Sequence, residues 1–118
     1  LIEKILETNK EIIISSQYTL ENSKFYKHPK IKWLYCVPKY PCSLEDIDFS
    51  ELDKFDGFSN HCPQLIAPLS ASILGAKIIE IHITSSKTKN FVDNNVSFDY
   101  NELTDTVKAI RLSEKIKR

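Results

Sequence analysis

The chain has 118 residues, with 16 basic and 16 acidic side chains and a formal net charge of zero. This length allows one small domain, and the balanced charge gives no electrostatic reason to expect nucleic acid or an acidic membrane surface as a partner. No apolar run approaches the roughly 20 residues that a transmembrane helix requires. We therefore expect neither nucleic acid nor a membrane among its partners.

The cysteine count bears on the cellular location of the chain, and the first residue bears on whether it is a fragment. Cys36, Cys42 and Cys62 are an odd number of cysteines with no CxxC pair, which favours reduced thiols and a cytoplasmic location over a disulfide scaffold. The sequence contains no methionine and begins with Leu1. We therefore expect a fragment of a longer protein, with residues 1–118 forming a single segment.

The hydrophobic pattern predicts four strands separated by helices. In chain order, we expect a helix over 1–9, a strand over 11–15, a weak helix over 19–27, a strand over 31–37, a short helix over 44–52, a strand over 55–59, a helix over 65–74 with Pro63 in its first turn, a strand over 77–83, a loop over 85–97 and a last helix that begins at Asp99. Gly75 is suited to end the seventh of these elements. Glu102, three residues after Asp99, predicts a capping box for the last helix.

The order of these elements, a helix followed by four strand-to-helix units, favours an α/β fold with a parallel sheet and helices outside it. Four units form either a small open sheet or half of a TIM-type (β/α)8 barrel. An isolated half-barrel has two bare strand edges and one uncovered apolar face. We therefore expect a homo-oligomer or a separate N-terminal half to complete it.

Two histidines follow the third and fourth predicted strands. In parallel α/β folds, ligands bind at the carboxyl ends of the strands, and adjacent strands lie about 4.8 Å apart. His61 and His82 can therefore meet on one metal ion. Ordinary hydrogen bonds that cap two strand ends are an equally good explanation, and two histidines do not identify a metal.

Other polar side chains at this edge carry weaker signals. Ser15 and Ser59 end strands, where a hydroxyl beside backbone amides can hold a phosphate. Asp93 lies in the long loop, from which it can reach the edge or face water. Lys39 is expected to be a solvated or anion-facing cation, and His28 is expected at the surface. No motif spacing supports zinc binding by Cys62.

Four segments resemble the sialic acid synthase family, which includes the N-acetylneuraminate, legionaminate and pseudaminate synthases. Residues 11–16 resemble the family's "VIIST" strand, and residues 35–41 resemble "HCVSxYP". Residues 57–61 resemble "GYSDH", followed by an "APLAAVALGA"-like stretch over 67–76. Residues 79–84 resemble "IEKHFT". The order and the spacing hold along nearly the whole chain.

The resemblance implies the C-terminal half of a (β/α)8 barrel that condenses phosphoenolpyruvate with an N-acetylated hexosamine, of the N-acetylmannosamine type, and releases phosphate. It implies a divalent ion, commonly manganese, held by His61 and His82, which would polarise the aldehyde oxygen of the open-chain sugar. Ser15 and Ser59 match positions that contact phosphoenolpyruvate. Tyr40 and Asp93 match positions that contact the sugar.

The chain departs from the family at several positions. Asn60 replaces the aspartate before the first histidine, Pro38-Lys39 replaces a small polar pair with a phosphate-binding asparagine, and residues 90–94 replace "PGPDH". The first four strands, with their substrate-binding carboxylate and lysines, and the C-terminal antifreeze-like domain lie outside this sequence. The sequence therefore supports two main hypotheses: half of an enzyme that is inactive alone, or a non-catalytic half-barrel that assembles with itself or a partner. A third, closer to the first, is a related condensation of phosphoenolpyruvate with another aldose.

Overall fold

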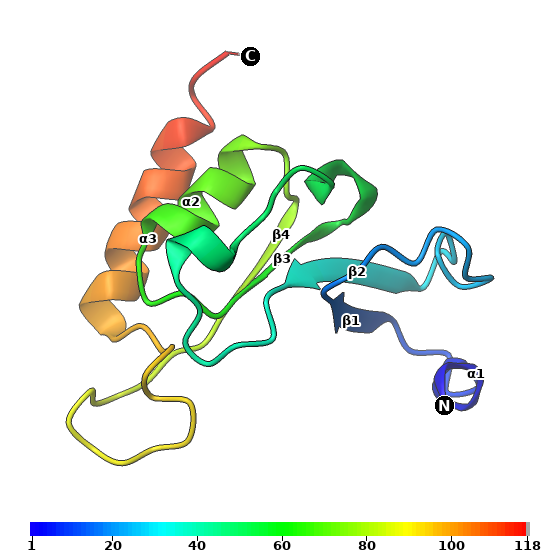
Figure 1. Ribbon diagram of the computed structural model, residues 1–118, viewed down its shortest axis with the longest axis horizontal. Helices are drawn as coiled ribbons and strands as arrows, with labels where there is room; N and C mark the ends of the chain where they lie inside the picture. The colour runs from blue at the N-terminus through cyan, green and yellow to red at the C-terminus, as the bar shows by residue number, and fades with distance from the viewer. Residues whose placement is uncertain (118) are drawn as a thin grey trace.

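Four parallel strands form one twisted sheet in the computed structural model, which describes residues 1–117. The strands are β1 (Ile12–Ser16), β2 (Ile31–Cys36), β3 (Gly57–Asn60) and β4 (Ile78–Ile81), and they lie side by side in sequence order (Figure 1). Each strand pairs in parallel with the next. The predicted α/β fold with a parallel sheet is confirmed.

Three α-helices accompany the sheet: α1 (Ile2–Leu6), α2 (Ile66–Ile73) and α3 (Tyr100–Ser113). Helix α2 packs against β3, β4 and α3, and α1 lies near the β1 end of the molecule, far from the other two helices (Figure 1). The capping box of α3 is confirmed, because Asp99 accepts a hydrogen bond from the Glu102 amide and the Glu102 carboxylate accepts one from the Asp99 amide, both at 2.8 Å.

The predicted helix over residues 19–27 is wrong. This segment forms turns, in which the Ser23 amide donates to the Leu20 carbonyl and the Tyr26 amide donates to the Ser23 carbonyl. The Ser23 hydroxyl also accepts from the Phe25 amide at 3.2 Å, a local bond that competes with a helical one. Phe25 and Tyr26 then pack against the buried cluster of Ile12, Ile31 and Trp33.

The predicted helix over residues 44–52 is replaced by two short 3-10 turns, η1 (Leu44–Asp46) and η2 (Leu52–Lys54). Asp48 interrupts the helix, because its carboxylate accepts from the Ser50 amide and its own amide donates to the Tyr35 hydroxyl at 3.1 Å. The helix expected from Pro63 begins only at Ile66. Of the four predicted strand-to-helix units, the two that begin with β3 and β4 therefore contain an α-helix, and the two that begin with β1 and β2 do not.

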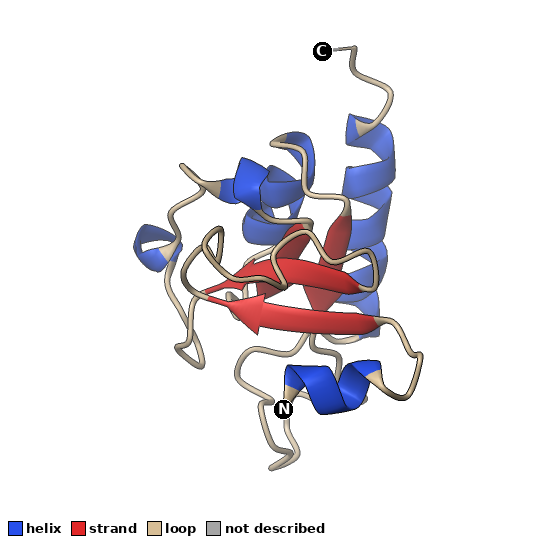
Figure 2. Ribbon diagram, turned by 90° about the vertical axis from the view of Figure 1, so that its right-hand side faces the viewer, coloured by secondary structure: helices blue, strands red, loops and turns tan. Residues whose placement is uncertain are grey.

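The two faces of the sheet differ. Side chains alternate along a strand, and one face packs Tyr35, Phe58 and Ile79 against Ala67 and Ala71 of α2. The helices and turns lie on this side of the strands (Figure 2). The opposite face carries Ser15, Lys32 and Glu80, which are all exposed. On this open face Leu34, Cys36 and Ser59 are nevertheless buried. No strand among residues 1–117 pairs with the outer edge of β1 or of β4.

No helix among the described residues combines the length and the apolarity needed to cross a bilayer.

Candidate functional site

His61 and His82 lie side by side at the carboxyl ends of β3 and β4. Asn60 pairs with Ile81 in the sheet register, so the next residues of the two strands are the histidines. Their ring centroids are 5.4 Å apart, and their planes are inclined by 66°. Both side chains lie on the open face, because His61 and His82 stand two residues after Ser59 and Glu80 and side chains alternate along a strand. The sheet therefore brings together two imidazoles that are 21 residues apart in sequence.

A backbone carbonyl orients the ring of His61. His61 is buried, and its Nδ1 lies 2.5 Å from the carbonyl oxygen of Val37. Because a carbonyl oxygen only accepts hydrogen bonds, a neutral His61 ring carries its proton on Nδ1 and keeps a free lone pair on Nε2. Metal-ligating histidines are held in this way, with the second ring nitrogen donating to a carbonyl or carboxylate.

His82 has no equivalent acceptor. Its Nδ1 is buried and has no hydrogen-bond partner among the described residues. The backbone carbonyl of His82, by contrast, accepts from the Phe98 amide at 2.8 Å. The main chain of His82 is therefore fixed while its ring is free to present a nitrogen to a ligand.

These two side chains fit a divalent ion. With metal–nitrogen bonds of about 2.1 Å, two imidazoles on one ion have ring centroids about 5 Å apart, close to the observed separation. No group of three or more His, Cys, Asp or Glu side chains suited to a metal occurs within residues 1–117. The remaining ligands would have to be water or substrate, a ligand set that suits manganese or magnesium better than a structural zinc site.

Tyr40 covers the histidine pair. Its ring lies 4.1 Å from that of His61, inclined by 31°, and 6.2 Å from that of His82. Half of the Tyr40 side chain remains exposed. Desolvation raises the pKa of its phenol, with smaller contributions from the negative charges of Cys36, Asp93 and Glu80. Tyr40 therefore stays protonated and can donate a hydrogen bond at this edge.

A polar pair lies one step below the histidines on the open face. The Ser59 hydroxyl donates to Oε1 of Glu80 at 2.6 Å. Cys36 on β2 pairs with Ser59. Burial, and to a smaller extent the charge of Glu80, raises the pKa of the Cys36 thiol. Ser59 is thus buried and already hydrogen-bonded, whereas Ser15 is exposed on β1, where it pairs with Leu34.

Asp93 and Lys39 lie at the margin of the site. Asp93 is exposed in the loop after β4, and its charge acts on Tyr40. Lys39 is exposed, as expected, and its Nζ forms an ion pair with Asp46 at 2.5 Å. His28 lies away from the pair, and its Nδ1 accepts from the Lys30 amide at 3.2 Å. The structure thus gathers Tyr40, Ser59, His61 and His82 closely, and Ser15 and Asp93 less closely.

Sequence reasoning missed three contributors: Glu80, the Val37 carbonyl and Cys36. Glu80 stands two residues before His82, as Ser59 stands two residues before His61, so the period of two in a strand predicts all four on one face. That signal could have identified Glu80. The Val37 carbonyl carries no signal in the side-chain sequence.

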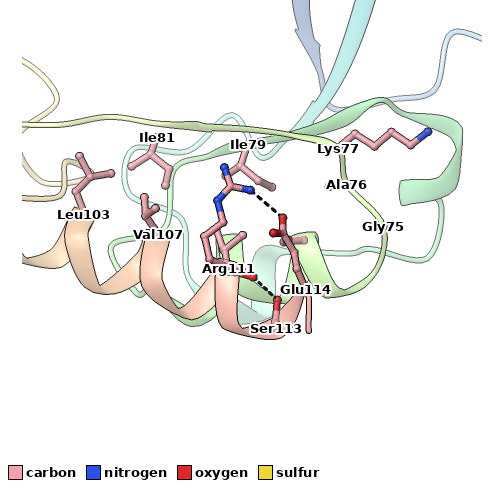
Figure 3. A pocket seen from close by; sticks show the side chains of 12 residues that line it. Gly75, Ala76, Lys77, Ile79, Ile81, Leu103, Val107, Arg111, Ser113 and Glu114 are labelled. Atoms are coloured by element: carbon pink, nitrogen blue, oxygen red, sulfur yellow. Dashed lines mark hydrogen bonds and ion pairs between the residues drawn. The ribbon is translucent and has the colours of Figure 1, made fainter. Parts of the chain in front are cut away.

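A cavity of about 760 Å³ lies away from the histidines. It runs between β4 and α3 and is lined by Ile79 and Ile81 from the strand and by Leu103, Val107 and Ile110 from the helix. Figure 3 shows the apolar side chains of α3 directed toward the strand, with Arg111 and Glu114 paired at one end. Ile79 and Ile81 are on the helix-covered face, so this groove and the histidine pair are on opposite faces of the sheet.

Comparison with known proteins gives consistent results. The model of the NeuB family matches residues 1–118. Pseudaminic acid synthase of Campylobacter jejuni serotype O:2 is 29% identical over 96% of this chain and 37% of its own length. Human N-acetylneuraminate-9-phosphate synthase is 28% identical over 97% of this chain and 36% of its own length.

A solved structure shares the fold. The N-acetylneuraminic acid synthetase of Leptospira borgpetersenii serovar Hardjo-bovis, crystallised with citrate, superposes with a TM-score of 0.84 at 25% identity. The match covers 97% of this chain and 45% of that structure. The chain thus spans less than half the length of these relatives.

Proposed function

The chain belongs to the NeuB family, and from this premise we propose that it is the C-terminal half of a sialic acid synthase-like barrel that carries the metal site. The complete enzyme would condense phosphoenolpyruvate with an N-acetylated hexosamine and release phosphate. The similarity to a pseudaminic acid synthase and to an N-acetylneuraminate-9-phosphate synthase supports this class of reaction.

One observation carries the proposal: His61 and His82 meet at the carboxyl ends of adjacent strands, with His61 held by Val37 so that Nε2 is free. A divalent ion bound there, most simply manganese, would act as a Lewis acid on the aldehyde oxygen of the sugar. The imidazoles would hold the ion, and Tyr40 would shield one side of His61 from water.

The other site residues would position the substrates. Ser59 donates its proton to Glu80, so its hydroxyl would have to turn away from this carboxylate to donate to the phosphate of phosphoenolpyruvate. Ser15 would contact the same substrate from β1, where its side chain is exposed. Asp93 and Tyr40 would contact the hydroxyl groups of the sugar at the rim. The acceptor sugar is proposed as a class only, because Lys39 and residues 90–94 depart from the family's pattern.

Two features support completion of the site by four further strand-to-helix units. The outer edges of β1 and β4 and the groove beside α3 are open in the described chain. The buried Nδ1 of His82 has no acceptor within it, and an acceptor from the missing half would complete the support that His61 already has. We propose that this half is needed for activity.

Manganese binding by the purified chain tests this function. The free ion would be counted by electron paramagnetic resonance during titration. We expect about one ion per chain, lost in His61→Ala and His82→Ala and retained in His28→Ala, whose histidine lies outside the site. Equal binding by all four proteins would contradict the proposal.

The alternative is a non-catalytic half-barrel that assembles with itself. The unpaired edges of β1 and β4 favour it, because such edges are templates for pairing with another chain. A stable homodimer that binds no manganese would support this alternative against the first.

A further inference from the structure

The loop between β4 and α3 is anchored to the sheet at its base. Beyond β4, the Thr84 amide donates to the Phe98 carbonyl at 2.9 Å, and the Phe98 amide donates to the His82 carbonyl at 2.8 Å. Val96 and Phe98 are fully buried. The returning end of the loop therefore lies beside His82, and the position of this end is set by the core.

The tip of the loop has a fixed backbone conformation at Asp93. Asp93 adopts a positive φ of 58°, which a non-glycine residue adopts at some cost in free energy. Its carbonyl oxygen accepts from the Val96 amide at 3.1 Å and from the Ser97 hydroxyl at 2.8 Å. These bonds form a tight turn that directs residues 94 and 95 back toward the sheet.

Asn95 connects this tip to the other side of the site. Its Nδ2 donates to the carbonyl oxygen of Tyr40 at 2.9 Å, across 55 residues of sequence. The ring of the same Tyr40 lies on His61, with centroids 4.1 Å apart. One amide side chain thus links the loop that bears Asp93 to the tyrosine that covers a candidate metal ligand.

We infer that Asn95 is a positioning residue, which holds the Asp93 loop and the Tyr40–His61 stack in one fixed arrangement. This inference rests on the proposed function, in which Asp93 would contact the sugar while His61 holds the ion that polarises it. The sugar-binding loop and the metal ligand would then be aligned before substrate arrives.

The hydrogen bond is exposed, so its loss should loosen the arrangement without unfolding the chain. One hydrogen bond changes an equilibrium by about two- to tenfold. We expect manganese affinity at the histidine pair to fall by about this factor when Asn95 loses its amide, because Tyr40 no longer restricts the ring of His61. Asn95 touches neither histidine, so it would act through Tyr40.

The test compares two pairs of variants of the full chain. Asn95→Asp is nearly isosteric and removes the donor, and Asn95→Ala removes the whole amide without adding charge. Asn90→Asp and Asn90→Ala are matched controls in the same loop, since the Asn90 side chain is exposed. The readouts are the ring resonances of Tyr40 and His61 by NMR, amide exchange over residues 91–97, and the manganese dissociation constant.

The inference predicts that both Asn95 variants shift the ring signals of Tyr40 and His61, accelerate amide exchange in the loop and raise the dissociation constant, whereas both Asn90 variants do not. Unchanged ring signals in both Asn95 variants, or equal effects at Asn90, would overturn it. If the unaltered chain binds no manganese, the proposed function fails, while the ring signals and the exchange rates still decide the role of Asn95.

Discussion

The hydroxyl of Ser59 donates a 2.6 Å hydrogen bond to Oε1 of Glu80, joining β3 to β4 one step below the two histidines. The same carboxylate faces Cys36 from β4, and its charge is the second cause, after burial, of the raised pKa of that thiol. This row of side chains crosses three strands of the open face.

Substitution Glu80→Gln should therefore lower the pKa of Cys36. The amide keeps an acceptor for Ser59 and removes the negative charge that disfavours the thiolate. Burial remains, so the pKa should stay above the ordinary thiol value. The rate of alkylation by iodoacetamide as a function of pH, followed by mass spectrometry, measures the change.

Cys42 is the internal control in that experiment. Burial, and then the neighbouring Cys62, raise its pKa to about 11, and Glu80 is not among the causes. Its alkylation profile should be the same in both proteins, with half-maximal rate near this value. An equal shift at both cysteines would mean that Glu80→Gln loosens the core instead of removing one charge.

Lys39→Ala should raise the pKa of Asp46. The hydrogen bond from Lys39 is the largest cause that lowers this pKa to about 2, ahead of those from Ser43. Because the folded-state pKa lies below the unfolded value of 3.8, the pair stabilises the fold above about pH 4 and loses this effect as pH falls toward about 2. The carboxyl carbon shift of Asp46, titrated by NMR, gives the pKa directly. A titration that is identical with and without Lys39 would contradict the assignment of the shift to this pair.

Asn60→Asp should destabilise the chain, although the family pattern has aspartate at this position. Asn60 is fully buried, and it both donates to the Cys62 carbonyl at 2.7 Å and accepts from the Cys62 amide at 3.2 Å. Ionised aspartate still accepts from the Cys62 amide but cannot donate, so the buried Cys62 carbonyl would lose its partner and face a buried negative charge, at a cost of about 1–3 kcal/mol.

Urea denaturation measures this cost. Asn90→Asp, the same change at an exposed loop position, is the control and should leave the unfolding free energy unchanged within about 0.5 kcal/mol. Equal midpoints for the two variants would show that the site tolerates a carboxylate, and that Asn60 reflects no structural requirement.

Gly57→Ala should be more damaging than Gly75→Ala. A Cβ at Gly57 would lie 2.0 Å from the Ile78 carbonyl oxygen in the paired strand, so β3 and β4 would have to separate, at a cost of about 3 kcal/mol or more. Gly75 is exposed and has a φ of 109°, and alanine there should cost about 1–2 kcal/mol. Thermal unfolding followed by circular dichroism ranks the two variants, and the reverse order would contradict the packing at Gly57.

The predictable part of the fold is the part with a strong local signal. Apolar runs identified β1, β2 and β4, while the shorter segment of β3 was predicted without a branched apolar run. Asp99 with Glu102 identified the start of α3, because capping needs only these two side chains. The two wrong helices failed for a local reason as well. Ser23 and Asp48 bond to neighbouring amides, and Tyr35 takes an amide that a helix would have used.

The adjacency of His61 and His82 was predictable because the order of parallel strands follows from their short connections. Their roles as ligands, and those of the substrate-contacting residues, remain predictions. The Val37 carbonyl and the Asn95–Tyr40 bond were not predictable, since each joins segments whose separation depends on loop conformation. Asn95 resembles any polar loop residue until the turn at Asp93 directs it toward Tyr40.

The strand order β1-β2-β3-β4 also bears on how the molecule folds. Each strand pairs with the strand that follows it in sequence, so every step of sheet assembly closes a chain segment of about 20 residues, with a modest loss of chain entropy. Topologies with such short sequence separations fold faster than those that must join distant segments. Each strand of this sheet can therefore pair with the strand before it as the polypeptide leaves the ribosome, and the pair of histidines forms when β4 joins β3.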